Sequence, residues 1–311
     1  MSLALVAGAW ALLALPLLVR PFALRMSPRE FAAAGMIATA SGLAALQGGL
    51  IITAAPTVLR SAGLTDLAIA CERSFRPLAV GGAPVAWAAG LGALAIAALA
   101  TRAIVQAMRA QRRARADSWL GAHFDRGAFD LVILPTDAPL AYSVGGRHPQ
   151  VILSKGLVAV LEPTELEIVI GHEAAHVRAR HYRYLVLIGV AERVAGWLPG
   201  VRASTTSLRG SLERWADGEA AGTDPQRRKH LRGALLTTVH AMAAPDLAAF
   251  GVTALVERAA ALAEAPSKAS GVSRLVTWCA LGLALLVAVS ALAIWLADAR
   301  SALAMAGYCP S

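Results

Sequence analysis

The sequence predicts a mainly α-helical membrane protein with four spans and one folded α+β domain between the third and fourth. Its composition is the first indication, because 57% hydrophobic residues, 16% charged residues and a mean hydropathy of +0.58 are too apolar for an ordinary soluble domain. The second indication is a set of four uncharged runs, each long enough to cross a hydrocarbon core as a helix. They cover residues 3–19, 31–53, 84–101 and 275–297.

The arginines predict the orientation of these spans. No basic residue precedes the first run and three follow it, which favours an uncleaved helix with its N-terminus outside over a cleaved signal peptide. Five more arginines follow the third run within residues 102–117, against three in the whole of residues 54–83. Residues 102–274, between the third and fourth runs, are therefore predicted to be cytoplasmic. The net charge of +9 then reflects topology and contact with anionic lipid, since nothing indicates a nucleic-acid module.

The chain divides into three predicted parts. Residues 1–101 form a membrane region with three transmembrane helices, and residues 102–274 are long enough for one cytoplasmic domain. Residues 275–311 hold the fourth transmembrane helix and a short extracytoplasmic tail, after a linker over 266–271 (PSKASG).

The cytoplasmic part combines helices with a small sheet. Residues 102–117 predict a basic helix, and 129–135 (FDLVILP) have the pattern of a short strand. Residues 140–156 cluster β-forming residues around a Gly-Gly pair, which predicts a hairpin. Thr164 then opens a helix, because Thr164 to Glu167 has the pattern of a capping box.

That helix carries an HExxH motif. His172 and His176 stand four residues apart, so both imidazoles project from one face of the helix. This arrangement predicts a zinc site with one ion, with Glu173 as general base toward a water at the metal. Two buried structural histidines are the alternative. On a continuous helix His181 would face away from His172, toward water or headgroups, so the third ligand must lie elsewhere.

A second predicted helix, residues 211–222 (SLERWADGEAAG), supplies the remaining groups. Glu213 would complete a His₂Glu site, and Asp217, one turn further on, would fix the tautomer of a ligand histidine. The alternative is a solvated helix face.

These segments together resemble a known family. The order AYSVGG, VILSKGLVAVL, EIVIGHEAAHVRARH and ERWADGEA, with basic transmembrane flanks, is similar to the BlaR/MecR-type membrane metallopeptidases, relatives of the HtpX-type gluzincins. The resemblance implies a cytoplasmic zincin-type domain, with zinc held by His172, His176 and Glu213, Glu173 as base and Asp217 behind a ligand. Only residues 298–311 follow the last predicted span, so the resemblance does not extend to the penicillin-binding sensor domain of that family.

The expected protein is an integral zinc endopeptidase of the cell membrane. Its substrate would be a protein or peptide, and its role would be regulatory or signal-transducing proteolysis. An edge strand formed by Ala141, Tyr142, Ser143 and Val144 would bind the substrate backbone, or would be plain sheet. The oxyanion donor is left open among Tyr142, His230 and His240. A separate sensor partner or a homo-oligomer fits the same sequence.

Two other classes compete with the peptidase. A non-catalytic sensor or scaffold would bind metal only for structure. A transporter is disfavoured, because the four spans carry no ionisable residue. The apolar segment 184–200 is interrupted by Glu192 and Arg193, which predicts contact with the membrane or the other helices. In this topology Cys71 and Cys309 share the oxidising side, where they would be either bridged or free.

Overall fold

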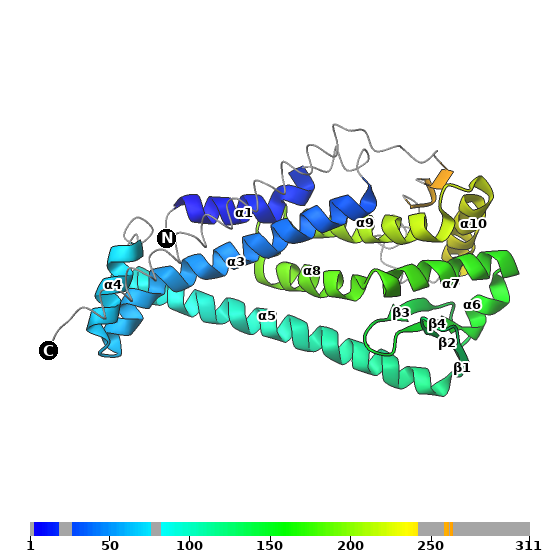
Figure 1. The fold of residues 1–311 in the computed structure, drawn as a ribbon, viewed down its shortest axis with the longest axis horizontal. Helices are drawn as coiled ribbons and strands as arrows, with labels where there is room; N and C mark the ends of the chain where they lie inside the picture. Colours follow the sequence, from blue (N-terminus) through cyan, green and yellow to red (C-terminus); the bar gives the residue numbers. More distant parts are fainter. Residues whose placement is uncertain (1–2, 19–26, 76–81, 242–257, 261, 264–311) are drawn as a thin grey trace.

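The computed structural model describes residues 3–18, 27–75, 82–241, 258–260 and 262–263. The molecule is elongated, with long helices that run along its length and a small sheet at one end (Figure 1). The first four described helices are α1 (Leu3–Leu18), α3 (Pro28–Ser61), α4 (Thr65–Phe75) and α5 (Ala83–Asp117).

Two helices, α3 and α5, are long and apolar enough to cross a membrane. The predicted second and third spans lie within them. Large apolar side chains on both helices are exposed, among them Ile51 on α3 and Leu91 and Leu94 on α5, with 51%, 67% and 69% of their surface accessible. The first predicted span corresponds to α1, a shorter helix that contains Pro16. The fourth predicted span, the linker over 266–271 and Cys309 lie outside the described residues.

The predicted basic helix over 102–117 is the second half of α5 rather than a separate element. No proline or glycine interrupts the helix after Gly92, so the apolar and basic halves join without a break. The helix therefore connects the apolar end of the molecule to the sheet, as Figure 1 shows.

The sheet has four strands in the order β1-β2-β4-β3. The strands are β1 (Ala122–Asp125), β2 (Asp130–Leu134), β3 (Ala141–Val144) and β4 (Gln150–Ser154). The predicted strand and hairpin are confirmed as β2 and the antiparallel pair β3–β4, in which Tyr142 lies opposite Ile152. β2 and β4 run parallel in the centre, so β3 is an edge strand.

Five helices follow the sheet. They are α6 (Lys155–Val160), α7 (Pro163–Arg178), α8 (His181–Ala195), α9 (Val201–Ala221) and α10 (Pro225–Ala241). The predicted start of α7 at Thr164 was wrong. Glu162 is the N-cap and forms a capping box with Glu165, because Pro163 supplies the fixed φ that suits the first helical position.

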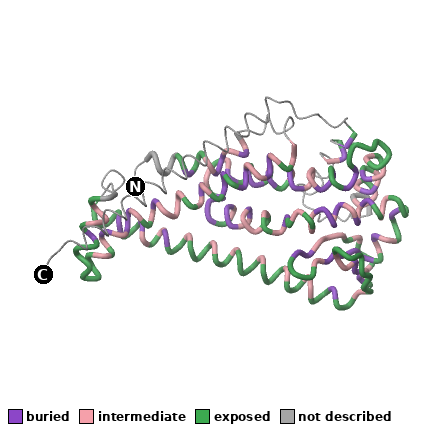
Figure 2. The backbone as a smooth tube through the Cα atoms, viewed as in Figure 1, coloured by how far each residue is buried: buried purple, intermediate pink, exposed green. Residues whose placement is uncertain are grey.

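Two apolar cores hold the domain together. One lies between the sheet and α7, where Val151 and Leu153 of β4 pack with Ile170 and Ala174. The other joins α3 to α8 and α9 through Phe31 and the residues packed around it: Ala32, Met36, Ile188, Leu208 and Leu212. The start of the predicted second span is thus covered by protein, and buried positions concentrate where these helices meet (Figure 2).

Candidate metal centre

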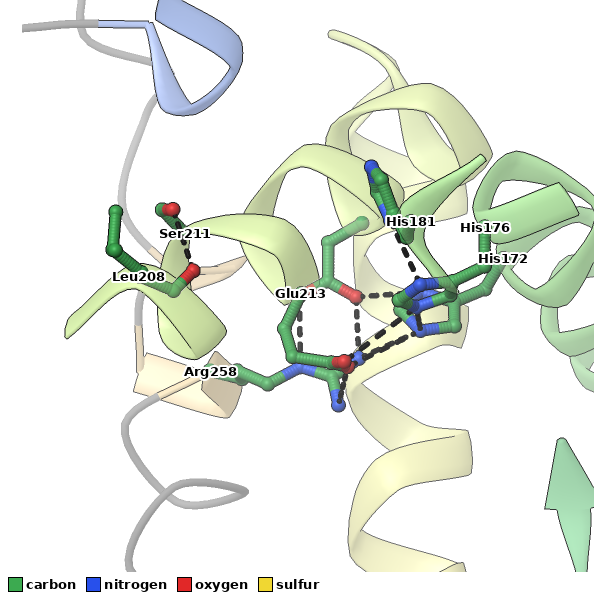
Figure 3. Close-up of polar contacts among 8 residues, drawn as sticks. His172, His176, His181, Leu208, Ser211, Glu213 and Arg258 are labelled. Carbon is green, nitrogen blue, oxygen red and sulfur yellow. Dashed lines mark hydrogen bonds and ion pairs between the residues drawn. The ribbon is translucent and has the colours of Figure 1, made fainter. Parts of the chain in front are cut away.

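The histidines of the HExxH motif converge on one point. Helix α7 projects both imidazoles toward α9, and their Nε2 atoms lie 3.1 Å apart (Figure 3). Both side chains are largely buried, with 8% of His172 and 12% of His176 exposed. Two imidazole nitrogens this close, away from bulk water, suit shared coordination of a cation.

Glu213 of α9 supplies the third ligand group. Its carboxylate oxygens lie 3.4 Å from Nε2 of His172 and 3.6 Å from Nε2 of His176. Ligands about 2.1 Å from a tetrahedral ion lie about 3.4 Å from one another, so the separations of these donor atoms fit zinc. His172, His176 and Glu213 form a set able to hold a metal ion. The Glu213 side chain is 37% exposed, so it is the ligand group that is most accessible to solvent.

Asp217 fixes one ligand from behind. Its Oδ1 lies 2.9 Å from Nδ1 of His172, so Nε2 of that ring faces the metal position. Burial by itself lowers the pKa of His172, but contacts with Asp217 and Glu213 outweigh it and raise the pKa to about 9. Burial would raise the pKa of Glu213, yet His172 and Arg258 lower it to about 2. The carboxylate is therefore ionised at neutral pH, as a ligand must be.

His181 also lies behind the site, contrary to the prediction that it faces water or headgroups. Its side chain is fully buried and its Nδ1 lies 2.8 Å from Nδ1 of His176. The prediction assumed one continuous helix, but α7 ends at Arg178 and Arg180 adopts a left-handed conformation with φ of 55°. This break turns His181 back toward the site. Burial and the neighbouring His176 lower the pKa of His181 to about 4, so it is neutral and can accept a proton from His176.

Glu173 lies close to His172 and Glu213, on the helix that carries both histidines. Burial raises its pKa above the ordinary value, and His172 and a hydrogen bond from Ser143 of β3 oppose that shift. A raised pKa brings a carboxylate closer to the range in which it exchanges protons with water at neutral pH. Ser143 thus brings the edge strand close to this carboxylate.

Arg258 completes the site and is the residue that sequence reasoning missed. Its Nε and one terminal nitrogen donate to Asp217 at 3.0 and 2.6 Å, and the other terminal nitrogen lies 2.9 Å from Glu213. The guanidinium thus neutralises two carboxylates of the site, Glu213 at the metal position and Asp217 behind His172. Arg258 stands 45 positions after Glu213 with no motif around it. The one available signal is a charged pair, Glu257 and Arg258, within an apolar stretch.

The position of β3 bears on the choice of oxyanion donor among Tyr142, His230 and His240. Tyr142 packs on the sheet face that carries Val132 and Ile152, toward Ala114 of α5, whereas Ser143 points to Glu173. Tyr142 therefore lies on the face of β3 away from the base. His230 lies on α10, and the side chain of His240 lies outside the part of the chain that the structure describes, so the choice between these two stays open.

A His₂Glu set with a carboxylate behind one ligand and a glutamate beside it is the donor arrangement of gluzincin metallopeptidases. Comparison with known proteins points to the same class. Residues 106–213 match the sequence model described as Peptidase family M48, a range that ends at Glu213 and includes the HExxH motif. This match covers about a third of the chain.

Three proteins named as protease HtpX homologs are similar to part of the chain. The homolog of Methanocaldococcus jannaschii is 33% identical over 75 residues, which are 22% of this chain and 26% of that protein. The homolog of Thermococcus kodakarensis is 39% identical over 69 residues, 21% and 22% of the two chains. The homolog of Moorella thermoacetica is 38% identical over 71 residues, 22% and 23%. The matched region is about a quarter of each relative's length. No solved structure matches. Together these matches support an HtpX- or M48-type metallopeptidase.

Proposed function

We propose that this chain is a membrane-bound zinc endopeptidase whose metal centre consists of His172, His176 and Glu213. The convergence of these donor atoms at tetrahedral separations carries the proposal. When bound, zinc would act as a Lewis acid on a water molecule and on the peptide carbonyl. One ion is expected, because the described residues form one such group.

The protein's own residues would then handle protons and substrate. Glu173 would take a proton from the attacking water and return it to the departing amine. Asp217 and His181 would hold the two ligand histidines in the tautomers that leave Nε2 free. Arg258 would keep the two carboxylates ionised and in place.

The edge strand β3 is the proposed substrate strand. Residues Ala141 to Val144 bond to β4 on one side, so the other backbone edge is available for an added strand. Ser143 contacts Glu173, which would place a peptide added along β3 beside the base.

The proposed location is the cell membrane, as a multi-pass protein with the metal centre in the cytoplasm. Exposed apolar side chains on α3 and α5 and the arginines after the apolar half of α5 support this orientation. A BlaR/MecR-type relationship and a regulatory role remain proposals that rest on the quoted motifs. A metal-stabilised sensor or scaffold without activity is the competing function.

The test is substitution of Glu173 by glutamine, with proteomes compared between cells expressing the wild type and the variant. The peptidase predicts fragments that disappear in Glu173→Gln while the purified variant keeps its zinc. A scaffold predicts identical fragments in both, and that result would reject the enzyme.

A further inference from the structure

The turn between α8 and α9, residues 196–200, lies among the apolar parts of three other helices. The last turns of α8 and the first residue of α9 form an apolar cluster with α1, α3 and α5. From α8, the turn and α9 the cluster contains Val190, Val194, Ala195, Leu198 and Val201. From α1, α3 and α5 it contains Leu13, Leu43, Leu46, Ile96, Ala100 and Ala103. Most of the latter fall within the three uncharged runs that predict membrane spans.

The turn is also fixed to α1 by polar contacts. The indole nitrogen of Trp10 donates to the carbonyl of Pro199 at 3.0 Å, and the amide of Leu17 donates to Ser204 at 3.1 Å. Gly200 has φ of 80°, and a β-carbon there would lie 3.3 Å from Leu17. The turn is therefore a packed feature rather than a loose loop.

Two charged side chains of α8 extend away from the turn, whereas Arg202 of α9 donates its Nε to the carbonyl of Gly196 in the turn at 3.0 Å. Arg193, in the last turn of α8, donates to Gln106 of α5 at 2.8 Å, beyond the end of the uncharged run. Glu192 pairs with Arg209, more than two turns along α9 from Gly200, at 2.9 Å. Long side chains at the edge of a bilayer reach toward water in this way while their stems lie against apolar surface.

Trp197 lies in the turn between α8 and α9 and is 76% exposed. Trp10, which contacts the same turn, is 42% exposed. The indole N–H groups of both residues donate to backbone carbonyls, that of Trp197 to Val194 at 3.0 Å, so the exposed parts of both rings are apolar.

We propose that the α8–α9 turn dips into the bilayer from the side on which the metal centre lies, with Trp197 in contact with lipid. This inference rests on the proposed membrane location. The occupant around Trp197 is lipid rather than a partner protein, because the turn's neighbours on α3 and α5 themselves expose apolar side chains over the same stretch. The parts of α8 and α9 further from the turn stay in water, since Glu192 and Arg209 pair on their outer surface.

Spin labelling tests the depth of the turn. The three native cysteines are replaced by alanine, and single cysteines are introduced as Trp197→Cys, Trp119→Cys and Leu94→Cys for labelling in the full chain. Trp119 is a matched control, because it is 82% exposed but lies beyond the basic end of α5. Leu94, 69% exposed on the apolar half of α5, reports on membrane location itself.

The labelled proteins are reconstituted in vesicles of phosphatidylcholine and phosphatidylglycerol, and collision of each label with oxygen and with a water-soluble nickel chelate is measured. We expect the oxygen-to-nickel ratio at positions 197 and 94 to exceed that at 119 severalfold. A lipid-like ratio at 94 with an aqueous ratio at 197 overturns this inference alone. A label at 197 shielded from both reagents also overturns it, because protein would then cover the turn. An aqueous ratio at 94 rejects the membrane location, and bound zinc in each variant confirms the fold.

Discussion

His181 and His176 face each other through their Nδ1 atoms at 2.8 Å. A ligand histidine that binds metal through Nε2 carries its proton on Nδ1, so His176 donates and His181 accepts. The remaining His181 nitrogen is buried without a hydrogen-bond partner among the described residues, and the ring packs against Trp215 at 4.6 Å between centroids. The acceptor for His176 is thus a second histidine, whereas the carboxylate of Asp217 is the corresponding partner of His172.

Removing the acceptor should weaken the metal site without removing a ligand. We expect His181→Ala to lower zinc affinity by roughly 10–100-fold, because His176 loses the contact that fixes its orientation. His181→Asn should restore part of that loss, since the amide oxygen can accept the same proton. Competition with a fluorescent zinc chelator measures the affinity. His148→Ala, an exposed histidine on the hairpin loop, serves as control. Equal loss in His181→Ala and His181→Asn would indicate a packing effect alone.

The metal content of purified variants should rank the site residues. Glu213→Ala and His176→Ala each remove a donor atom and should lose most of the bound zinc. Asp217→Ala should lose less, because the ligand remains and only its orientation is freed. Glu173→Gln should keep its zinc and lose cleavage. Elemental analysis gives the ranking, and full zinc in Glu213→Ala would sink the assignment of the third ligand.

Arg258 should matter most when the metal is absent. In Arg258→Ala the carboxylates of Asp217 and Glu213 lose their paired cation, and breaking a buried ion pair costs about 3–5 kcal/mol. Zinc supplies positive charge at the same place, so we expect the melting temperature to fall further with EDTA than with zinc. Arg209→Ala, which removes an exposed pair with Glu192, should change both melting temperatures little. An equal fall with and without zinc would contradict this role.

The orientation of the domain is open to a reporter test. A reporter that works only in the cytoplasm should be active when fused after residue 160 and inactive when fused after residue 311, because the arginines predict that 102–274 is inside. Alkaline phosphatase fused at the same points should give the opposite pattern. If phosphatase is active after residue 160, the proposed topology is wrong and the metal centre lies outside.

Local patterns predicted most of the metal centre. The four-residue spacing of His172 and His176 identifies one helix face, and Glu213 with Asp217 repeats that spacing on a second helix. The structure brings these four side chains together. The strand β4 and its hairpin with β3 were visible for the same reason, since their burial follows from a short apolar run.

Features that depend on tertiary contacts were not predictable. The role of His181 depends on the left-handed Arg180, and arginine gives no local signal for that conformation. Arg258 reaches the site from a separate helix segment, so its partners could not be inferred from spacing. Strand β1 has four exposed residues and no apolar alternation, so no pattern predicted it. Helix α4 lies within residues 54–83, which were predicted only as the outer loop between the second and third spans.

The length of α8 acts as a spacer between the metal centre and the proposed membrane contact. This helix has fifteen residues, from His181 to Ala195, and the rise from the first to the last is about 21 Å. An extended peptide needs roughly six residues to cover that distance at about 3.3 Å each. With α8 upright in the proposed orientation, the proposed peptidase would cut a membrane-anchored substrate only where an unfolded segment of at least this length leaves the bilayer. Bonds inside the bilayer would then stay beyond the reach of Glu173.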